Sequence, residues 1–399
     1  MKLLVFAHHL ELGGTQINAI ELSTRLRDMH GFDVVVHATE GPALSILKSK
    51  ALRYIPAPDA RLHPSPARIA ALRSVVSQER PDLIHAWDWW QGLEAYYGVH
   101  LMRGTPLLIT DMMMDLTRSM PRRIPTTFGF AGLVRKADAA GWKNTHLLLP
   151  PVDVDFNAAG IVDGKAFRTA LAVRDEDILL VSVSRLANHM KSECLERAIA
   201  VVGELGASLP LRLVLVGNGE AGPRLQAMAD AANRSLGREA VTLYGAMSDP
   251  RAAYDAADVV IGMGGSALRG MAFSKPLIVV GEKGFARTFT PEAAPDFIET
   301  GMFGIGDGDP RNVALSQAIR GLATSSGPRT ELGAFGRDFV TGNHGLDAVA
   351  ATLAGYCRNT VAQSRRSLNN TAADALRTGF YYMRERRFRV PSRDVTAQT

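Results

Sequence analysis

Short apolar runs alternate with amphipathic stretches along most of the chain. The amphipathic stretches carry apolar residues three and four positions apart, as at Ala19, Leu22 and Leu26. The apolar runs are continuous and rich in branched aliphatic residues; they occupy residues 2–8, 33–38, 82–87, 106–110, 146–151, 178–185, 211–219, 241–245, 258–264 and 276–282. Continuous apolar strands separated by helices are typical of parallel sheets covered on both faces. The pattern therefore predicts an α/β fold with doubly wound parallel sheets.

The alternation pauses once, over "LLLPPVDVDFNAAG" at residues 147–160, and restarts at Ile178. A chain of 399 residues suits two domains of Rossmann size better than one. We therefore predict an N-terminal Rossmann-like domain over residues 1–157 and a second over residues 158–345. A C-terminal helical segment with a basic tail is expected over residues 346–399.

The charge of the chain is concentrated at its C-terminal end. The whole sequence has a formal charge of +5, and residues 360–399 alone hold eight arginines and three acidic residues. A basic tail on a nearly neutral body argues against nucleic acid as a partner. It leaves two alternatives: a terminal helix packed on the body with solvated arginines, or peripheral contact with anionic lipid at the inner membrane face. Without a long apolar window, the expected location is the cytoplasm.

Two cysteines at unrelated positions predict neither a disulfide framework nor a metal site. Near the start, "HHLELGGTQ" places His9, Gly13 and Gly14 between a strand and a helix. The free N–H groups at a helix start attract phosphates or sugar oxygens, although a plain tight turn would have the same sequence. Because the spacing lacks the full G-x-G-x-x-G pattern, NAD binding is disfavoured.

Cations follow one strand of the predicted second domain. In "VSVSRLANHMK", Arg185 ends the strand and Lys191 follows six residues later. Two cations at the carboxyl edge of a parallel sheet suit a diphosphate, whose charge they would stabilise as it leaves. A solvated surface pair is the alternative.

The stretch "GMGGSALRG" joins a strand to a short helix. We expect Ser266 to cap this helix, which would place Arg269 in its first turn. A cation there opposes the helix dipole by about 0.3–1 kcal/mol, so Arg269 should face an anion. Asp258, Glu282 and a ligand phosphate are the alternatives.

Aromatic residues cluster in "PDLIHAWDWWQG", with His85 and Asp88 at the end of a predicted strand. Trp87, Trp89 and Trp90 are three of only four tryptophans in the sequence. Flat aromatic faces beside hydrogen-bonding groups often hold sugars, although tryptophans also fill cores.

The order of several stretches along the chain is characteristic. They are "GGTQINAIEL", "PPVDVDFN", "VSVSRL" with Lys191, "LVLVGNGE", "VTLYGAMSDPRAAYDAADVVIG" and "ALRGMAFSKPLIVVG". In order and spacing the chain resembles the family 4 glycosyltransferases over about residues 1–358. The resemblance implies the GT-B architecture, in which two Rossmann-like domains hold mainly the acceptor and mainly the nucleotide-sugar donor. It also implies a retaining, metal-independent transferase without a cofactor, in which the leaving phosphate helps to deprotonate the acceptor.

Residue by residue, the resemblance implies three groups. The expected catalytic residues are Arg185, Lys191 and His85. The expected donor-binding residues are Gly13, Gly14, Gly217, Gly264, Gly265, Ser266, Ala267, Leu268, Arg269 and Glu282. The expected acceptor-binding residues are His9, Trp87, Asp88 and Asp111.

The sequence departs from the family in its E-x7-E motif. Arg269 stands where the second glutamate would be, and Ile261 where strict spacing puts the first. Trp87 stands where the family's first-domain motif commonly has a second histidine, two residues after His85. Glu282 is our candidate for the acid that replaces the missing glutamates. We predict a hexosyltransferase-like enzyme that moves a sugar from a UDP- or GDP-sugar to a glycan, lipid-linked or small-molecule hydroxyl. The alternatives are a non-catalytic nucleotide-sugar or glycan-binding relative and a GT-B nucleotide-sugar epimerase.

Overall fold

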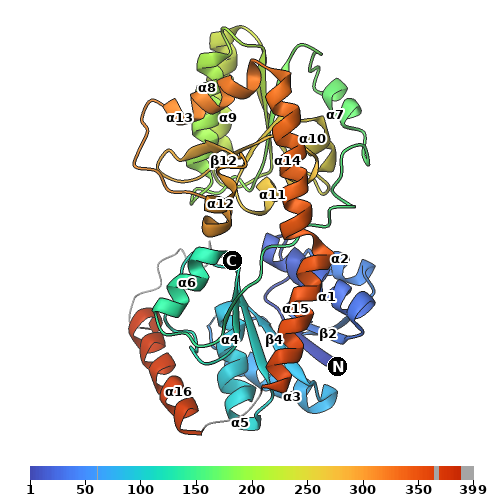
Figure 1. Cartoon of the computed structure of the whole chain (residues 1–399), viewed down its shortest axis with the longest axis vertical. Helices are drawn as coiled ribbons and strands as arrows, with labels where there is room; N and C mark the ends of the chain where they lie inside the picture. The colour runs from blue at the N-terminus through green and yellow to red at the C-terminus, as the bar shows by residue number, and fades with distance from the viewer. Residues whose placement is uncertain (61, 364–367, 388–399) are drawn as a thin grey trace. The chain divides into compact units, whose positions relative to one another are not determined.

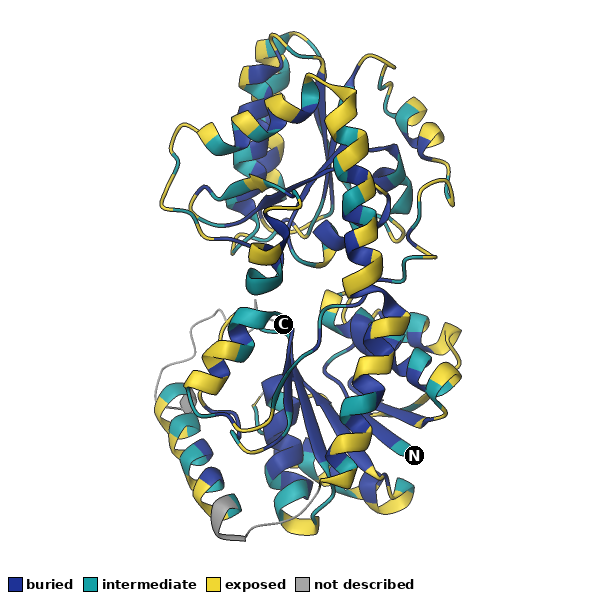
Figure 2. Cartoon of the chain, in the orientation of Figure 1, coloured by how far each residue is buried: buried dark blue, intermediate teal, exposed yellow. Residues whose placement is uncertain are grey.

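A computed structural model describes residues 1–60, 62–363 and 368–387. The chain forms two compact units, each built around its own sheet (Figure 1). The first unit comprises Met1–Pro151 and the chain from Leu346 onward, and the second comprises Val152–Gly345. In both units the sheet is buried and the helices expose one side (Figure 2).

The first unit holds a seven-stranded parallel sheet in the order β3-β2-β1-β4-β5-β6-β7. Its strands are β1 (Lys2–Phe6), β2 (Asp33–Ala38), β3 (Arg53–Pro56), β4 (Leu83–Trp87), β5 (Leu107–Asp111), β6 (Thr126–Phe128) and β7 (Thr145–Leu147). In β1, Leu3 and Val5 pack into one core, and Leu4 and Phe6 pack into the core on the opposite face. This two-sided burial explains the continuous apolar runs in the sequence.

Helices cover both faces of this sheet. They are α1 (Gly14–His30), α2 (Leu44–Ser49), α3 (Pro66–Glu79), α4 (Asp88–Ala95), α5 (Leu101–Arg103), α6 (Ala131–Ala139), α15 (Leu346–Ala362) and α16 (Leu368–Tyr382), with π-helical turns η1 (Tyr96–His100) and η2 (Met383–Arg387).

A buried ion pair joins α3 to α4. Arg68 Nε donates to Glu94 Oε2 at 2.8 Å, and Ser65 N donates to Glu94 Oε1 at 2.9 Å. Both charged residues are buried, and the Arg68 guanidinium also lies over the ring of Phe6. Because each charge is desolvated, each depends on the other for compensation.

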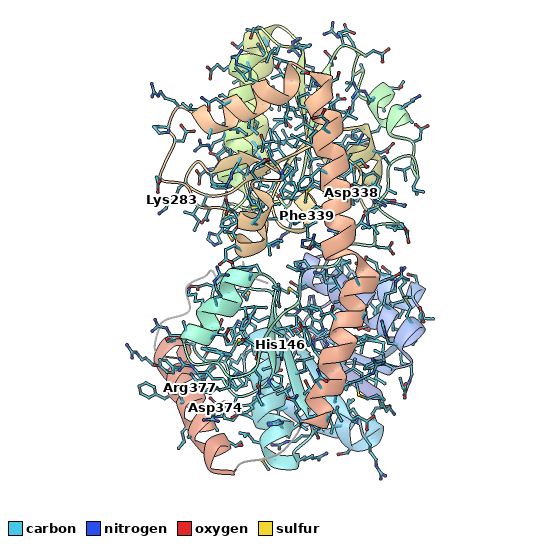
Figure 3. All side chains as sticks on the ribbon, viewed as in Figure 1. His146, Lys283, Asp338, Phe339, Asp374 and Arg377 are labelled. Carbon is cyan, nitrogen blue, oxygen red and sulfur yellow. The ribbon has the colours of Figure 1, made fainter. Side chains whose placement is uncertain are left out.

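The C-terminal segment packs onto the first unit. On α16, the Asp374 carboxylate accepts hydrogen bonds from the backbone N–H groups of Arg122 and Arg123 (3.1 and 3.2 Å). Arg377 donates to the carbonyl oxygens of Arg118 and Met120 (Figure 3). The expectation that the arginines of this segment are solvated is therefore wrong for Arg377, and the predicted separate segment 346–399 is part of the first unit as far as it is described.

The second unit holds a six-stranded sheet in the order β10-β9-β8-β11-β12-β13, in which only the β12–β13 pairing is antiparallel. Its strands are β8 (Ile178–Val183), β9 (Leu211–Val216), β10 (Val241–Gly245), β11 (Val259–Gly262), β12 (Leu277–Val280) and β13 (Ala286–Thr288). Its helices are α7 (Gly164–Ala170), α8 (Ser192–Leu205), α9 (Gly222–Leu236), α10 (Arg251–Ala256), α11 (Gly265–Ala272), α12 (Ala294–Thr300), α13 (Val313–Ala323) and α14 (Ser326–His344).

The division between the units falls earlier than the sequence suggested. Val152 N donates to His344 O at 2.7 Å, and Arg337 Nη1 donates to Asn157 O at 2.9 Å. These bonds tie residues 152–157 to α14, so the second unit begins at Val152 and not at residue 158. Among the helices that the structure describes, none is both long and apolar enough to cross a membrane.

Candidate functional site

Each sheet has a point where the connections leave two neighbouring strands in opposite directions. In the first unit this point lies between β1 and β4, and in the second between β8 and β11. In open α/β sheets, ligands bind beyond the carboxyl ends of the strands at such a switch point. Most of the predicted site residues follow these strands, so they are described below one unit at a time.

Two cations follow β8 in the second unit. Arg185 is exposed, and Lys191 is half-buried at the residue before α8. Burial lowers the pKa of the Lys191 ammonium, and the nearby Arg185 charge lowers it further. Neither side chain forms a hydrogen bond or ion pair with any part of the chain that the structure describes. The charge of Arg185 also contributes to the lowered pKa of Glu220, after the backbone hydrogen bonds of that carboxylate. Two adjacent positive charges that form no ion pair are suited to an anion of two charges.

The backbone holds this loop against the loop that follows β9. Leu186 N donates to Asn218 O, and Ala221 N donates to Leu186 O, both at 2.8 Å. Gly217 has φ 145°, and a Cβ there would lie 1.8 Å from Ser184 O. The glycine is thus required by the close approach of the two loops. Its expected contact with a donor stays a prediction.

The helix α11 begins two residues earlier than the sequence suggested. Its N-cap is Gly264, with φ 55°, and Ser266 Oγ donates back to Met263 O instead of capping the helix. The prediction that Ser266 is the cap is therefore wrong, because glycine at 264 adopts a left-handed φ that serine disfavours. Arg269 accordingly lies in the last turn of this short helix.

The guanidinium of Arg269 nevertheless returns to the helix start. A Cβ at Gly265 would lie 3.5 Å from Arg269 Nη1, because helical side chains tilt toward the N-terminus. Asp258 is not its counter-ion, since Asp258 Oδ2 accepts from Arg168 Nη1 at 3.0 Å and from Leu179 N at 2.7 Å. Within the described chain, the Arg269 side chain has no hydrogen bond and no ion pair, with Glu282 or any other residue. Of the three alternatives, a ligand anion remains.

A carboxylate in the first turn of α8 fixes the loop that carries Glu282. Glu193 accepts hydrogen bonds from the backbone N–H groups of Lys283 (2.9 Å) and Gly284 (2.8 Å). Lys283 is labelled in Figure 3. Glu193 lies two residues after Lys191, so it positions one loop of the edge relative to another. The sequence analysis missed Glu193, because an acid at a helix start is expected from the dipole alone.

An imidazole and two carboxylates meet at the switch point of the first unit. His8 Nε2, just beyond β1, is hydrogen-bonded to Asp88 Oδ2 at the start of α4. Asp88 has φ 64°, and its Oδ1 accepts from Met112 N at 3.2 Å. At the end of β5, burial and then the charge of Asp88 raise the pKa of Asp111 well above its usual range. The Asp111 carboxyl therefore favours the protonated form, which can donate a hydrogen bond.

Two polar atoms of this cluster are left without a hydrogen bond among the described residues. His8 Nδ1 and Asp111 Oδ2 are buried and have no hydrogen-bond partner among the described residues. The sequence analysis selected His9, whose half-exposed ring instead pairs with Glu11 at 2.9 Å. His8 could have been found from its place at the end of a central strand. Which of the two adjacent histidines turns inward depends on the loop, which the sequence does not reveal.

Two predicted residues are buried on β4. His85 is buried on β4, where its Nε2 lies 2.6 Å from Thr110 Oγ1, and burial lowers its pKa to about 3. Trp87 is buried as well and packs into a core cluster. Both side chains are covered because β4 is central, and the catalytic role for His85 and the acceptor-binding role for Trp87 stay predictions.

Of the glycine pair near the start, Gly13 precedes the helix as expected, whereas Gly14 is already part of it. Gly13 is the N-cap of α1 and Gly14 is its first residue. A Cβ at Gly14 would meet no atom within 4 Å, so the backbone there is open to a close approach. In the described part of the chain, no group of three or more histidine, cysteine, aspartate or glutamate side chains could hold a metal ion. The roles of the glycines and metal independence stay predictions.

Two Rossmann-like units with polar clusters at their switch points define a two-domain α/β protein of the GT-B class. Residues 12–137 match the model described as Glycosyltransferase Family 4, and residues 177–325 match the model described as Glycosyl transferases group 1. Together the two matches span more than half of the sequence. The chain belongs to the family 4 glycosyltransferases, and it is a glycosyltransferase.

Several solved structures share this fold. HepE from Anabaena in complex with UDP is 16% identical, with a TM-score of 0.70 over 90% of this chain and 100% of that one. A glycosyltransferase from Rickettsia africae is 13% identical, with a TM-score of 0.71 over 90% and 99%. Sucrose-phosphate synthase from Thermosynechococcus elongatus is 16% identical, with a TM-score of 0.69 over 91% and 100%. No curated protein matches the sequence.

Proposed function

We propose that the protein transfers a sugar from a nucleoside-diphosphate sugar to an acceptor hydroxyl with retention of anomeric configuration. The observation that carries this proposal is the pair of adjacent cations Arg185 and Lys191 at the carboxyl edge of the second sheet, neither of which forms an ion pair with the described residues. As the glycosidic bond to the donor breaks, negative charge grows on the diphosphate. Cations fixed beside it stabilise that charge without further reorganisation.

Arg269 extends the same donor site. Its guanidinium lies beside the first turn of α11, where helix N–H groups also favour an anion. A guanidinium cannot accept hydrogen bonds from ribose hydroxyls as the family's glutamate would. We therefore assign Arg269 to the anionic part of the donor and Glu282 to the ribose hydroxyls. The HepE structures with UDP and with UDP-glucose favour a UDP-sugar, with a GDP-sugar as the alternative.

The acceptor belongs to the first unit in this proposal. Asp88, Asp111 and His8 offer a carboxylate, a protonated carboxyl and an imidazole within one cluster. Such a set can both donate hydrogen bonds to a sugar hydroxyl and accept them from it. The acceptor class is a glycan, a lipid-linked sugar or a small molecule, and the leaving phosphate accepts the proton of its hydroxyl. Neither a metal nor a cofactor takes part, and the proposed location is cytoplasmic.

A thermal-shift screen with UDP, GDP, ADP and their sugars tests this function. A ligand that binds only the folded state at about 100-fold above its Kd stabilises it by about 2.7 kcal/mol. We expect UDP or GDP and the matching sugar to raise Tm by several degrees, with little change from the nucleosides. The selected donor should then release its nucleoside diphosphate when acceptor classes are supplied. An unfolding midpoint that is the same with every nucleotide as without any would contradict the presence of a donor site.

Arg269→Glu should weaken donor binding at least about tenfold, since a charge-assisted hydrogen bond contributes about 1.5–3 kcal/mol. Calorimetric titration with the selected diphosphate measures the change. Lys165→Glu changes the same charge on exposed α7 and serves as the control. Tighter binding in Arg269→Glu would mean that the site is built for a carboxylate, against our assignment.

A further inference from the structure

An exposed apolar ridge runs along the C-terminal helix. Leu376, Phe380 and Met383 are 77%, 60% and 38% exposed, although each side chain is large and apolar. They stand four and three residues apart, so they share one side of α16 and the turn that follows it. Isolated apolar residues on a surface are ordinary, whereas three aligned along one helix face indicate a contact surface.

The opposite side of α16 fixes the ridge in this orientation. Asp374 and Thr378 are buried there, and the Tyr97 hydroxyl donates to Ala375 O at 2.7 Å. The Arg377 guanidinium lies 5.8 Å from the ring of Trp142 while it bonds to backbone carbonyls. With its polar anchors engaged on the body of the first unit, the helix cannot rotate to bury the ridge.

Cations border the ridge. The turn η2, which begins at Met383 and continues the ridge, holds three arginines and one glutamate, and Arg384 is exposed beside Met383.

One acid accompanies these arginines. Glu385 lies in η2, where three arginines outnumber it. On the anchoring side of α16, the Asp374 carboxylate is held by backbone N–H groups and by Arg377 Nε at 3.3 Å. The C-terminal end of the ridge therefore has a surplus of positive charge.

We propose that this face of α16 binds the surface of membranes that contain anionic lipids. The ridge enters the boundary between headgroups and acyl chains, and the bordering arginines attract the headgroups. Three apolar side chains fall far short of the roughly 800 Å² per partner of a standard protein interface, which favours lipid over a folded partner. The proposal rests on charge and apolar surface and is independent of sugar transfer.

Flotation of the full-length protein with vesicles tests this contact. Vesicles of phosphatidylcholine containing phosphatidylglycerol should bind the protein, and vesicles of phosphatidylcholine alone should bind it weakly. Leu376→Glu with Phe380→Glu should lower the partition coefficient at least about tenfold, because each loses an inserted apolar group and adds a repelled charge. Met29→Glu with Ile161→Glu alters two similarly exposed apolar residues elsewhere and should bind like the wild type.

Three results would overturn the proposal: no binding to the anionic vesicles, equal binding to both kinds, or unchanged binding by the ridge variant. The last would place any attachment in another segment. Light scattering after size exclusion measures the oligomeric state and so tests whether a second copy of the chain binds the ridge. A dimer that Leu376→Glu with Phe380→Glu dissociates, in protein that binds no vesicles, would identify the ridge as a self-association surface instead.

Discussion

Lys191→Ala is expected to lower kcat for sugar transfer by about 10²–10³-fold, the usual effect of removing one group that stabilises developing charge. The unfolding midpoint should stay the same or rise, because the ammonium is half-buried and has no ion pair or hydrogen bond within the described residues. Steady-state kinetics with the selected donor and thermal unfolding measure the two effects. The combination separates a role in the reaction from a role in the fold.

Arg185→Ala and Lys165→Ala complete this comparison. Arg185 is the exposed neighbour of Lys191, so Arg185→Ala should reduce transfer in the same direction. Lys165 lies exposed on α7 and serves as the matched control, which should turn over normally. Near-normal turnover in both Arg185→Ala and Lys191→Ala would contradict diphosphate binding at the carboxyl edge of the second sheet.

Glu94→Gln is expected to lower the free energy of unfolding by about 3–5 kcal/mol, because it leaves the buried Arg68 charge without compensation. Arg68 would keep neutral partners, among them Thr39 Oγ1 (2.9 Å) and the ring of Phe6, but no negative charge. Urea unfolding measures the loss. Asp115→Asn, which breaks the exposed pair with Lys136, should cost about 1 kcal/mol or less.

A loss below about 1 kcal/mol in Glu94→Gln would contradict this role for the ion pair. It would mean that α3 and α4 are held together by apolar contacts alone. Because Glu94 is remote from the second unit's cations along the chain and lies in the other unit, nucleotide binding by the folded variant should be unchanged.

The alternation of apolar runs was sufficient to predict both sheets. Strands such as Leu83–Trp87 and Leu211–Val216 are buried on two faces, and that burial is what makes the runs continuous. Three short strands escaped prediction, namely β3, β6 and the antiparallel β13, since none of them is longer than four residues. Arg185 and Lys191 could be located because a residue that follows a parallel strand necessarily lies at the sheet's carboxyl edge.

The remaining differences between sequence and structure arose where tertiary contacts decide. Position in a motif suggested a role for His85, but burial on a central strand places it in the core. Ser266 has a good capping side chain, yet the backbone begins the helix at Gly264. Arg377 looks like one more arginine of a basic segment, and only the structure shows it bonded to Arg118 O. Sequence patterns do not encode such contacts between distant segments.

Calorimetric titration of the wild type and Lys191→Ala with the selected nucleoside diphosphate and its nucleoside tests the central claim most directly. If Arg185, Lys191 and Arg269 bind the phosphates, the diphosphate should bind the wild type at least about 100-fold more tightly than the nucleoside, as expected for two charge-assisted contacts. In Lys191→Ala that ratio should fall at least about tenfold. Equal affinities for diphosphate and nucleoside, or a ratio unchanged in Lys191→Ala, would contradict the account.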